Sequence, residues 1–580
     1  MTTITPDPGN RNENHRGAGP SLRESPPQPG TLTAVPHADQ SQTTQKDAPV
    51  TYPGAPRPDR LRPTPLGELA ERLGVESPGP GEVTGITHDS RAVRPGDVYA
   101  ALPGARLHGA DFAAQAAGLG AAAVLTDPAG AERAAAATGL PVLVAGNPRA
   151  VMGEMAADIY GRPGIGLLQI GITGTSGKTT TAYLVEGGLR AAGRSTGLIG
   201  TVEMRIGDER IKSERTTPEA TDLQALFAVM RERGVEAVAM EVSSHALVLG
   251  RVDGCVFDVA VFNNLSPEHM EFHSGMEDYF QAKAQLFTPG RSHRGVVNFD
   301  DEYGRRLVTE SGVPVTTFSA EGHPDADWHA EDVLVGPQDS AFTAVGPNGE
   351  RVAARSPLPG PFNVANTLAA IVTLAVAGVD PQTAADGVAA VPGVPGRLER
   401  VDAGQPYLAV VDYAHKTDAV ESVLRSLQKV TEGRVHIVLG CGGDRDTTKR
   451  GPMGAAAARL ADTAVLTSDN PRSEDPLAIL AAMLAGAAEV PVHERGDVLV
   501  DADRAAAIAA AVARAEPGDT VLVAGKGHEQ GQDIHGVVRP FDDRKVLHAA
   551  IERSLGRTGA DDDAPAGAVD RAAPENNSQG

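Results

Sequence analysis

A chain of 580 residues is long enough for about three or four domains, and its 41% hydrophobic content can fill several cores. The formal net charge of −23 argues against nucleic acid as the main partner, because binding to a phosphate backbone needs clustered Lys and Arg. The two cysteines, Cys255 and Cys441, predict neither a disulfide framework nor a zinc cluster. No apolar run reaches the ~18 residues of a membrane span, and the start lacks a signal-peptide pattern, so we expect a cytoplasmic protein without membrane insertion.

Both ends of the chain are predicted to be disordered. Residues 1–60 contain eleven prolines and one aromatic residue, Tyr52. A segment of that composition cannot bury enough apolar surface to offset the entropy lost on ordering. The polar stretch 559–580, which includes three consecutive aspartates, leads to the same prediction.

Residues 61–163 are expected to form a small α/β domain. Strands are predicted at 98–102 and 121–125, and a helix is predicted between them at 112–119. The polar segment HDSR (88–91) falls between strands, and a plain turn is one interpretation of it.

A glycine-rich turn opens the domain expected at 164–395. The apolar run 165–172 leads into GTSGKTT (174–180), which predicts a buried strand, a tight loop and a helix. Free backbone N–H groups and the positive helix end would then face one hollow that suits phosphate. Lys178 would reach the outer phosphates, and the Thr179 hydroxyl would bind Mg²⁺. The strict phosphate-loop pattern is not met, because Ile172 takes the place of its first glycine, so an ordinary glycine turn is the alternative.

Strands and helices alternate through the rest of this domain, which predicts a mostly parallel sheet covered on both faces. The expected strands are 237–242, 256–262 and 295–299, and the expected helices include 221–233 and 278–287. Ligands of such sheets collect at the carboxyl ends of the strands.

Two of these strand ends are unusually polar. The segment EVSSH begins at Glu241, and the segment NNLSPEH ends at His269. We therefore expect Glu241 and His269 to approach the metal and phosphates held by Lys178 and Thr179. Taken alone, a glutamate at a strand end is more often a cap or a surface charge, and a lone histidine is usually structural.

Residues 396–558 are expected to form a third α/β domain. Each of its four predicted strands ends in a polar cluster, so we expect these clusters to line one ligand-binding opening at the edge of the sheet, which we call the mouth. The strands and clusters are 408–412 with DYAH (412–415), 435–439 with GGDR (442–445), 463–467 with DNPR (469–472), and 520–524 with GKGHE (525–529).

Together these clusters resemble those of the Mur ligases of peptidoglycan synthesis, in particular the ligases that add diaminopimelate. The segment GTSGKTT is shared with folylpolyglutamate synthetases, but the joint set is specific and collinear over residues 84–550. The set comprises HDSR (88–91), GTSGKTT (174–180), TTPE (216–219), EVSSHAL (241–247), NLSPEHMEFH (264–273), GPFNVANTLAA (360–370), GRLE (396–399), DYAH (412–415), GCGGDRD (440–446), SDNPR (468–472) and GKGHE (525–529).

The resemblance implies three α/β domains: a small UDP-binding domain, a central phosphate-loop domain that binds ATP, and a Rossmann-like C-terminal domain that brings the amino acid. The implied reaction joins diaminopimelate to the glutamate γ-carboxylate of UDP-N-acetylmuramoyl-L-alanyl-D-glutamate, while ATP becomes ADP and phosphate. An acyl phosphate is the implied intermediate, because a carboxylate must first gain a good leaving group. The expected partners are these small molecules with Mg²⁺, and a monomer is expected.

The same resemblance assigns a catalytic set that contains Lys178, Glu241, His269 and Lys283. Thr179 and Glu241 would hold one Mg²⁺, and His269 would lie near a second. Lys283 matches a carbamylated lysine, whose formation needs a neutral amine and hence a depressed pKa; a solvent-facing helix lysine is the alternative. The residues implied for ATP are Gly174, Thr175, Ser176, Gly177, Lys178, Thr179, Thr180, Asn363, Arg397 and His415, with Asn298, Asp300 and Asn366 near adenine or ribose.

The UDP-linked substrate is polar and anionic, so hydroxyl donors suit it. By resemblance its binding residues are Ser90, Thr216, Thr217, Ser243, Ser244 and Arg251. In the third domain the chain reads DYAHKTD (412–418) where the family pattern is DYAHTPD, so Lys416 adds a charge and a proline is lost. We expect altered nucleotide packing there without loss of binding.

Selection of the amino acid can be argued from charge. Diaminopimelate ends in an ammonium and a carboxylate, whereas lysine ends in an ammonium only, so a selective site needs a fork-shaped cation. Arg472 fits this role, with Asp469 and Asn470 beside the ammonium, although DNPR alone could be a simple turn. By resemblance three further residues complete the site, namely Arg445, Gly525 and Glu529. Nothing in the sequence predicts whether the meso or the LL isomer is used.

Two other interpretations stay open at this point. A related Mur ligase or folylpolyglutamate synthetase, with another acceptor or amino acid, would share the phosphate loop but lack DNPR together with GKGHE. A nucleotide-gated binding protein or an inactive homologue would bind ATP without substrate-dependent ADP formation. The expected catalytic residues are all present, which argues against a binding protein or an inactive homologue; these residues are Lys178, Glu241, His269 and Lys283.

Overall fold

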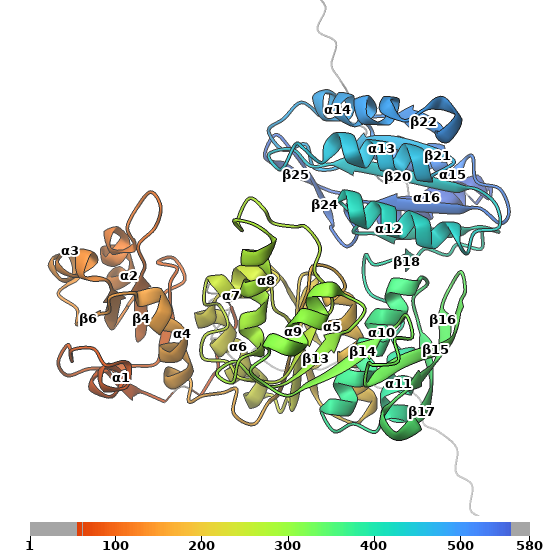
Figure 1. Cartoon of the computed structure of the whole chain (residues 1–580). Helices are drawn as coiled ribbons and strands as arrows, with labels where there is room; N and C mark the ends of the chain where they lie inside the picture. The colour runs from red at the N-terminus through yellow and green to blue at the C-terminus, as the bar shows by residue number, and fades with distance from the viewer. Residues whose placement is uncertain (1–54, 61, 558–580) are drawn as a thin grey trace, which may run out of the picture. The chain divides into compact units, whose positions relative to one another are not determined.

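The computed structural model describes residues 55–60 and 62–557 of the chain, and Figure 1 draws its elements. The disorder predicted for the two tails falls mostly on residues outside this range. Residues 55–60 lie inside it, and the buried side chain of Arg57 pairs with Asp97 at 3.1 Å. The folded part therefore includes a short segment that the sequence predicts to be disordered.

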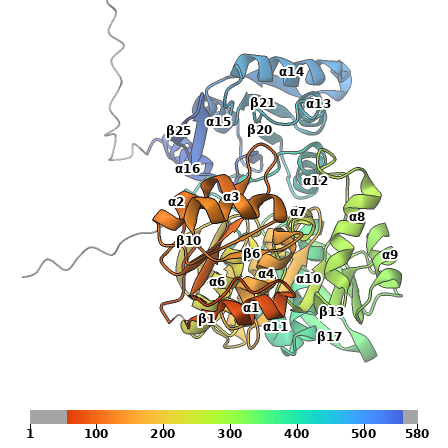
Figure 2. The same cartoon turned by 90° about the vertical axis from the view of Figure 1, so that its left-hand side faces the viewer.

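The first sheet has four parallel strands in the order β3-β4-β5-β6. Alternate residues of β4 face opposite cores: Val98 packs with α1 and α4, whereas Tyr99 packs with α2 and α3. Figure 2 shows these helices around the sheet. The predicted strands are confirmed, and the predicted helix is divided between η1 and α2. The elements are β1 (Thr64–Pro65), α1 (Leu66–Leu73), β2 (Glu82–Val83), β3 (Gly85–Thr87), β4 (Asp97–Ala101), η1 (Gly109–Phe112), α2 (Ala113–Gly118), β5 (Ala123–Thr126), α3 (Pro128–Thr138), β6 (Val142–Val144) and α4 (Pro148–Ile159).

The central sheet has eleven strands in the order β10-β9-β8-β11-β7-β12-β13-β14-β15-β16-β17. Neighbouring strands from β8 to β15 run parallel, and both edges are antiparallel. The elements are β7 (Leu168–Thr173), α5 (Lys178–Ala191), β8 (Thr196–Ile199), β9 (Glu203–Ile206), β10 (Glu209–Lys212), α6 (Ala220–Glu232), β11 (Ala237–Glu241), α7 (Ser244–Val248), β12 (Phe257–Phe262), α8 (Met276–Ala284), η2 (Gln285–Phe287), β13 (Ser292–Asn298), α9 (Glu302–Glu310), β14 (Val315–Ser319), β15 (Trp328–Val335), β16 (Ser340–Val345), η3 (Pro347–Gly349), β17 (Arg351–Ser356), α10 (Pro361–Val376) and α11 (Pro381–Ala389).

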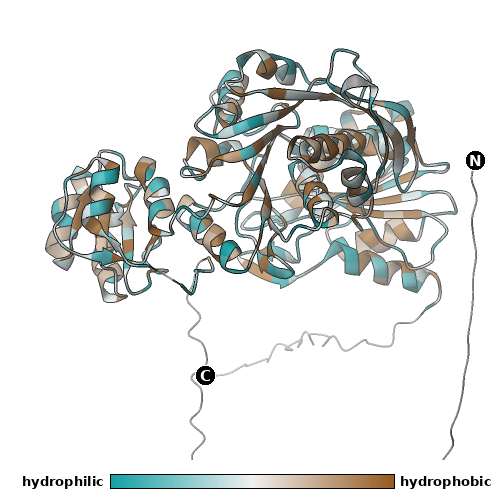
Figure 3. Cartoon of the chain, turned by 90° about the horizontal axis from the view of Figure 1, so that it is seen from below, coloured by the Kyte–Doolittle hydropathy of each residue, from teal (hydrophilic) through white to brown (hydrophobic). Residues whose placement is uncertain are grey.

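The inner strands of the central sheet are buried on both faces, which is why β7, β11 and β12 are apolar along most of their length. Ile170 and Ile172 of β7 pack with α5, α10 and α11 on one face. Val238 and Met240 of β11 pack with α6 and α8 on the other face. Figure 3 shows helices that carry both apolar and polar residues, as expected for helices that cover a sheet. The predicted, mostly parallel sheet is therefore confirmed.

Two details of the central sheet differ from the sequence prediction. The strand before the glycine turn begins at Leu168 and not at Ile165, because residues 164–167 form a turn in which Ile165 is 72% exposed. The antiparallel strands at the two edges are absent from the prediction. In β17 the residues alternate between exposed and buried, which is the period-2 signal of a strand with one solvated face.

The last sheet has the strand order β18-β19-β23-β20-β21-β22, and only its β18 edge is antiparallel. Helices α12, α13 and α14 pack on one face, and α15 and α16 pack on the other. All four predicted strands are confirmed. The elements are β18 (Glu399–Arg400), β19 (Leu408–Asp412), α12 (Thr417–Gln428), β20 (Val435–Cys441), α13 (Arg450–Leu460), β21 (Thr463–Ser468), α14 (Pro476–Glu489), η4 (Val492–Glu494), β22 (Asp497–Val500), α15 (Arg504–Val512), β23 (Thr520–Ala524), β24 (Gly531–Ile534), β25 (Val537–Pro540) and α16 (Asp543–Ser554).

Candidate active site

The glycine turn lies between the end of β7 and the start of α5, as the sequence predicts. Gly177 has φ +83°, and a Cβ atom there would lie 2.3 Å from Oδ1 of Asn366, so only glycine fits. Ser176 donates its backbone N–H to Oδ1 of Asn264 at 2.8 Å. The turn therefore forms a fixed loop at the N-terminus of a long helix, the place where a phosphate group is most readily bound.

Lys178 lies directly over this loop. Its Nζ donates to the backbone oxygens of Gly174 at 2.9 Å and Thr175 at 3.0 Å. Burial lowers the pKa of the Lys178 ammonium to about 8; the nearby Arg397 cation acts in the same direction, whereas the Glu241 carboxylate opposes the shift. The Lys178 ammonium thus lies at the loop and forms no ion pair in the part of the chain that the structure describes. A cation in this position suits an anionic ligand.

Glu241, at the end of β11, faces Thr179 of the loop. Thr179 donates its hydroxyl to Oε1 of Glu241 at 3.0 Å, and Thr201 donates its backbone N–H to the same oxygen at 2.7 Å. Nη2 of Arg397 donates to the Thr179 hydroxyl oxygen at 3.1 Å. The structure therefore brings together the carboxylate and the hydroxyl that the sequence selects for a metal.

The donor set fits Mg²⁺ that is shared with a nucleotide. In the part of the chain that the structure describes, no group of three or more His, Cys, Asp or Glu side chains could hold a metal by itself. Mg²⁺ commonly takes only one or two protein oxygens and completes its shell with water and substrate phosphates. Glu241 and Thr179 supply oxygens of that kind beside the loop.

Lys283 of α8 lies beneath the same loop and is 1% exposed, so the alternative of a solvent-facing helix lysine is wrong. Its Nζ donates to the backbone oxygen of Gly174 at 2.9 Å and lies 4.6 Å from the centre of the Tyr279 ring. Burial, reinforced by the Lys178 cation, lowers the pKa of Lys283 well below its ordinary value. The amine is therefore suited to remain neutral, which is the form that can react with carbon dioxide.

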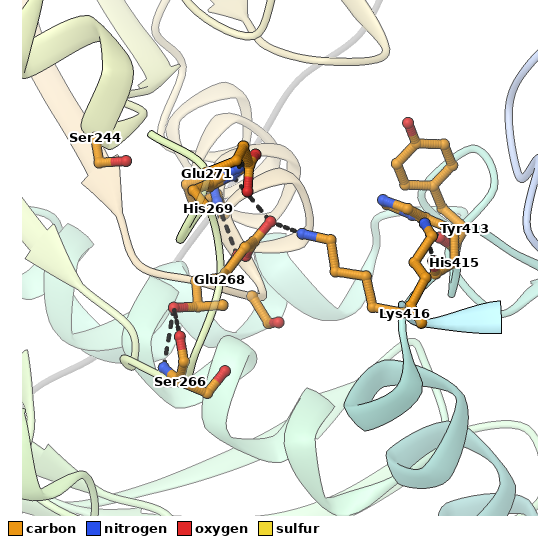
Figure 4. Close-up of polar contacts among 12 residues, drawn as sticks. Ser244, Ser266, Glu268, His269, Glu271, Tyr413, His415 and Lys416 are labelled. Carbon is orange, nitrogen blue, oxygen red and sulfur yellow. Dashed lines mark hydrogen bonds and ion pairs between the residues drawn. The ribbon is translucent and has the colours of Figure 1, made fainter. Parts of the chain in front are cut away.

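His269 lies near these groups in a polar cluster (Figure 4). Its Nε2 is 3.0 Å from Oε1 of Glu268, and its ring is in edge contact with Tyr279 at 6.3 Å between ring centres. Lys416 also forms an ion pair with Glu268, and Figure 4 shows Glu268 between Lys416 and His269. The sequence singles out His269 and Lys416 but not Glu268, whose contacts cannot be read from its position next to a proline.

Candidate residues for the UDP-linked substrate gather around the end of β11. Thr217 donates its hydroxyl to the backbone oxygen of Glu241 at 2.9 Å and accepts the backbone N–H of Ser243 at 3.2 Å. The hydroxyl of Thr216 lies 3.1 Å from that of Thr201, and the Ser244 hydroxyl lies 3.0 Å from Nε2 of His273. A row of hydroxyl groups therefore continues from the Glu241 carboxylate.

Two further candidates lie away from that row. Arg251 pairs with Glu219 through Nε at 2.9 Å, and Arg149 of α4 pairs with the same carboxylate at 3.0 Å. Ser90, in the loop after β3, donates its hydroxyl to Gln115 of α2 at 2.9 Å. Ser90 thus belongs to the first sheet and its surroundings, as a nucleotide-binding role in that domain requires.

The asparagines expected near the nucleotide differ in their surroundings. Asn366 of α10 packs against Gly177 and donates to Oδ1 of Asn363 at 3.1 Å, so this pair supports the glycine loop. Asn298 donates to the backbone oxygen of Asn263 at 2.8 Å, whereas the Asp300 carboxylate accepts the backbone N–H of Ala320 at 2.7 Å. In the last domain, Nδ1 of the half-buried His415 lies 2.7 Å from the Tyr413 backbone oxygen, and desolvation lowers the pKa of His415.

The ends of β21 and β23 lie together in the last domain. Gly525 has φ +113°, and a Cβ atom there would lie 2.7 Å from Oδ2 of Asp469, so the close approach requires glycine. Asn470 donates its Nδ2 to Oε2 of Glu529 at 2.9 Å. The DNPR and GKGHE segments therefore form one mouth, and the interpretation of DNPR as an isolated turn does not describe its contacts.

Arg472 enters this mouth from a left-handed backbone conformation with φ +53°. The β24–β25 hairpin holds that conformation: Arg472 donates its N–H to the Asp533 oxygen at 3.0 Å, and His535 donates its N–H to the Arg472 oxygen at 2.7 Å. Nη1 of Arg472 donates to the Gly443 oxygen at 2.6 Å. Arg445, two residues after Gly443, is exposed.

Two fully buried cations that sequence analysis leaves out support this mouth. Arg504 pairs with Asp543 at 2.7 Å and donates Nη2 to the backbone oxygen of Ala524, at the end of β23, at 3.0 Å. Lys526, the second residue of GKGHE, donates Nζ to Oδ1 of Asn470 at 3.0 Å. No local sequence pattern indicates burial of either side chain, since Lys and Arg are usually exposed.

Comparison with known proteins agrees with this geometry. Three family models match: the catalytic domain of the Mur ligase family over residues 82–160, the Mur ligase middle domain over 172–374, and the Mur ligase glutamate ligase domain over 396–527.

The chain is 82% identical over 508 residues to the UDP-N-acetylmuramoyl-L-alanyl-D-glutamate–2,6-diaminopimelate ligase of Streptomyces coelicolor, covering 87% of this chain and 100% of the relative. It is 47% identical over 498 residues to the ligase of the same name from Corynebacterium glutamicum, covering 84% of this chain and 95% of the relative. A solved structure of a ligase of that name superposes with a TM-score of 0.62 at 31% identity, covering 85% of this chain and 100% of that one.

Proposed function

The chain belongs to the Mur ligase family, and we propose that the clusters around its glycine loop and its last sheet carry out the two halves of one ligase reaction. The reaction is the ATP-dependent addition of diaminopimelate to UDP-N-acetylmuramoyl-L-alanyl-D-glutamate in peptidoglycan synthesis. The observation that carries the division of roles is the convergence of Lys178, Thr179 and Lys283 on one loop beside Glu241.

In the first half, the loop binds the phosphates of ATP. The Lys178 ammonium, which now donates to two backbone oxygens of the loop, turns to the outer phosphates and offsets their charge. Arg397 already donates to Thr179, so its guanidinium lies close enough to act on the same phosphates. These cations let a second anion, the substrate carboxylate, approach the γ-phosphorus.

The carboxylate oxygen of the terminal glutamate then bonds to the γ-phosphorus, and the bond to the ADP oxygen breaks. In the second half, the neutral amine of diaminopimelate bonds to the acyl carbon, phosphate leaves with the former carboxylate oxygen, and the nitrogen loses a proton. The hydroxyl row of Thr216, Thr217 and Ser243 would hold the acceptor's polar groups beside Glu241 during both steps.

Glu241 and Thr179 would hold Mg²⁺, which supplies positive charge next to the phosphate oxygens. His269 would contribute to a second such site. For Lys283 we propose carbamylation: its neutral amine bonds to the carbon of carbon dioxide and a proton leaves, which converts a buried neutral group into an anion. The desolvated position of Lys283 under the loop supports this step, because it favours the neutral amine.

We assign selection of the amino acid to the mouth of the last sheet. Arg472 would bind the far carboxylate of diaminopimelate, and Asp469 and Glu529 would bind ammonium groups. Arg445, which is exposed at the same edge, would complete the carboxylate site. L-Lysine lacks that carboxylate and would leave the ligand-facing N–H groups of the Arg472 guanidinium without a carboxylate partner.

The remaining assignments are also proposals. We place domain boundaries near residues 163 and 395, which lie between the matched family segments 82–160, 172–374 and 396–527. Within the described residues no helix is long and apolar enough to cross a bilayer. The substrates are nucleotide-linked and highly polar, so we propose action in the cytoplasm, as a monomer that size-exclusion chromatography with light scattering would test.

The test is phosphate release measured with the UDP-linked dipeptide, ATP, Mg²⁺ and one of three amino acids: meso-diaminopimelate, LL-diaminopimelate or L-lysine. The proposal predicts release with at least one diaminopimelate isomer, little with L-lysine, and none in Lys178→Met. Equal rates with L-lysine would refute the role given to Arg472. Full activity in Lys178→Met would refute the role of the loop.

A further inference from the structure

Lys526 is a buried ammonium at the edge of the amino-acid mouth. Its side chain is fully buried, whereas the side chain of Glu529, three residues later, is 34% exposed. Nζ of Lys526 donates to Oε2 of Glu529 at 3.1 Å. The ammonium therefore lies beneath the carboxylate, on the side away from solvent, and it leaves the outer part of the carboxylate free to meet a ligand.

The same ammonium fixes the amide of Asn470. Oδ1 of Asn470 accepts from Nζ of Lys526 at 3.0 Å and from the backbone N–H of Asp533 at 3.0 Å. With its oxygen held on that side, the amide must direct its NH₂ group toward Glu529, whose Oε2 lies 2.9 Å from Nδ2. Since the NH₂ group has two hydrogens, one remains for a ligand acceptor.

The unit formed by Lys526, Asn470 and Glu529 thus offers one acceptor and one donor side by side. A carboxylate oxygen of Glu529 can accept from an ammonium, and the second N–H of Asn470 can donate to a carboxylate. These are the two groups that both ends of diaminopimelate carry. Without the buried cation, Asn470 could rotate its amide, and the Glu529 carboxylate would lose its charged partner.

We propose that Lys526 is a positioning residue for the diamino acid: it touches no substrate, and it holds Asn470 and Glu529 in the arrangement that binds the ammonium and carboxylate. The inference rests on the proposed function of this mouth. It adds a residue that acts on amino-acid affinity and leaves the chemistry at the glycine loop untouched, since Lys526 contacts neither Lys178 nor Glu241 in the described structure.

The test is steady-state kinetics of the full-length Lys526→Met variant, with each of the three substrates varied in turn. The KM for diaminopimelate should rise about 10- to 100-fold, as expected for the loss of a charge-assisted hydrogen bond. The kcat and the KM for ATP should stay within about threefold, because no contact at the glycine loop changes. Lys429→Met, which removes an exposed lysine of the same domain, is the matched control and should match the unaltered chain.

A double-mutant cycle with Glu529→Gln separates positioning from general damage, and its comparison of the double variant with Glu529→Gln alone can be made even if Lys526→Met alone does not fold. If Lys526 acts through Glu529 and Asn470, the double variant should bind diaminopimelate no more than about threefold worse than Glu529→Gln alone. Multiplied effects of the two substitutions would overturn the proposal. An equal rise in the KM values for ATP and diaminopimelate would overturn it as well, because that result is expected from a purely structural role.

Arg472→Ala measured in parallel distinguishes failure of this inference from failure of the proposed function. If Arg472→Ala raises the KM for diaminopimelate and Lys526→Met does not, Lys526 has no positioning role and the mouth still binds the amino acid. If neither substitution changes that KM, the amino acid binds elsewhere, and both proposals are wrong.

Discussion

Replacing Arg472 with alanine removes the guanidinium that we assign to the far carboxylate of diaminopimelate. In the structure its Nη1 donates to the Gly443 oxygen at 2.6 Å, and its backbone is held on both sides by the β24–β25 hairpin. The hairpin bonds involve only main-chain atoms, so Arg472→Ala leaves them in place. The substitution should therefore affect the ligand far more than the fold.

The size of the expected increase in the KM for diaminopimelate follows from the hydrogen bonds that the substitution removes. A guanidinium binds a carboxylate through two charge-assisted hydrogen bonds, each worth about 1.5–3 kcal/mol net, and water in the emptied space recovers part of that. A loss of about 2–4 kcal/mol corresponds to an increase of about 30- to 1,000-fold in the KM for diaminopimelate. The KM for ATP should change by less than about threefold, because the glycine loop is unaltered.

The assay is phosphate release with diaminopimelate, L-lysine and ATP varied in turn. L-Lysine has no far carboxylate, so its slow reaction should not become slower in Arg472→Ala, and the preference for diaminopimelate should collapse. Arg459→Ala, which removes an exposed arginine of α13, is the control and should keep the preference. An unchanged preference in Arg472→Ala, or equal increases in both KM values, would refute the reasoning.

Three further predictions concern the cations of the two sites. Burial lowers the pKa of Lys178 to about 8, so its charge is lost as the pH rises past that value, and the Kd for ATP measured by calorimetry should rise about tenfold between pH 8 and 9.5. In Lys178→Arg the Kd should stay nearly constant over that range, because arginine keeps its charge. A constant Kd in the unaltered chain would contradict the assignment. Lys283→Ala should lose activity that bicarbonate does not restore and that a short carboxylate such as formate restores in part; full activity in this variant would remove the carbamate from the mechanism. Arg504→Met leaves the Asp543 carboxylate buried without its cation, so it should lower the free energy of unfolding in urea by about 3–5 kcal/mol. The double variant Arg504→Met/Asp543→Leu removes the unpaired carboxylate and should lose less stability. Equal losses in the two variants would contradict the role of the pair.

The strands that carry the site could be predicted because their apolar runs end abruptly in polar clusters. β19 and β23 match the predicted ranges residue for residue, and β11 ends at Glu241, one residue before its predicted end. The antiparallel edge strand β17 could not be predicted, because its burial alternates with period 2 whereas its sequence, RVAARS, does not alternate between apolar and polar residues. The exposure of Ile165 could not be predicted, because an apolar residue in a turn looks the same in sequence as one in a strand.

The residues of the candidate site also fall into two groups, those that the sequence predicts and those that it does not. Residues at strand ends, such as Glu241 and Arg472, follow from topology, because parallel strands bring their carboxyl ends to one edge. The supporting residues Lys526, Arg504 and Glu268 do not, because their roles depend on burial and on partners distant in sequence. Lys283 lies between these cases: its depressed pKa was implied by resemblance alone, and the structure supplies its burial and its contact with the Gly174 oxygen.

Transfer of oxygen from the acceptor to phosphate tests the central claim, activation of the carboxylate at the glycine loop, most directly. The terminal glutamate of the UDP-linked dipeptide is labelled with ¹⁸O in its γ-carboxylate, and the phosphate released in the presence of ATP and diaminopimelate is examined by mass spectrometry. The account predicts one ¹⁸O atom in each phosphate released. Phosphate that carries no ¹⁸O while the tripeptide product forms would contradict it.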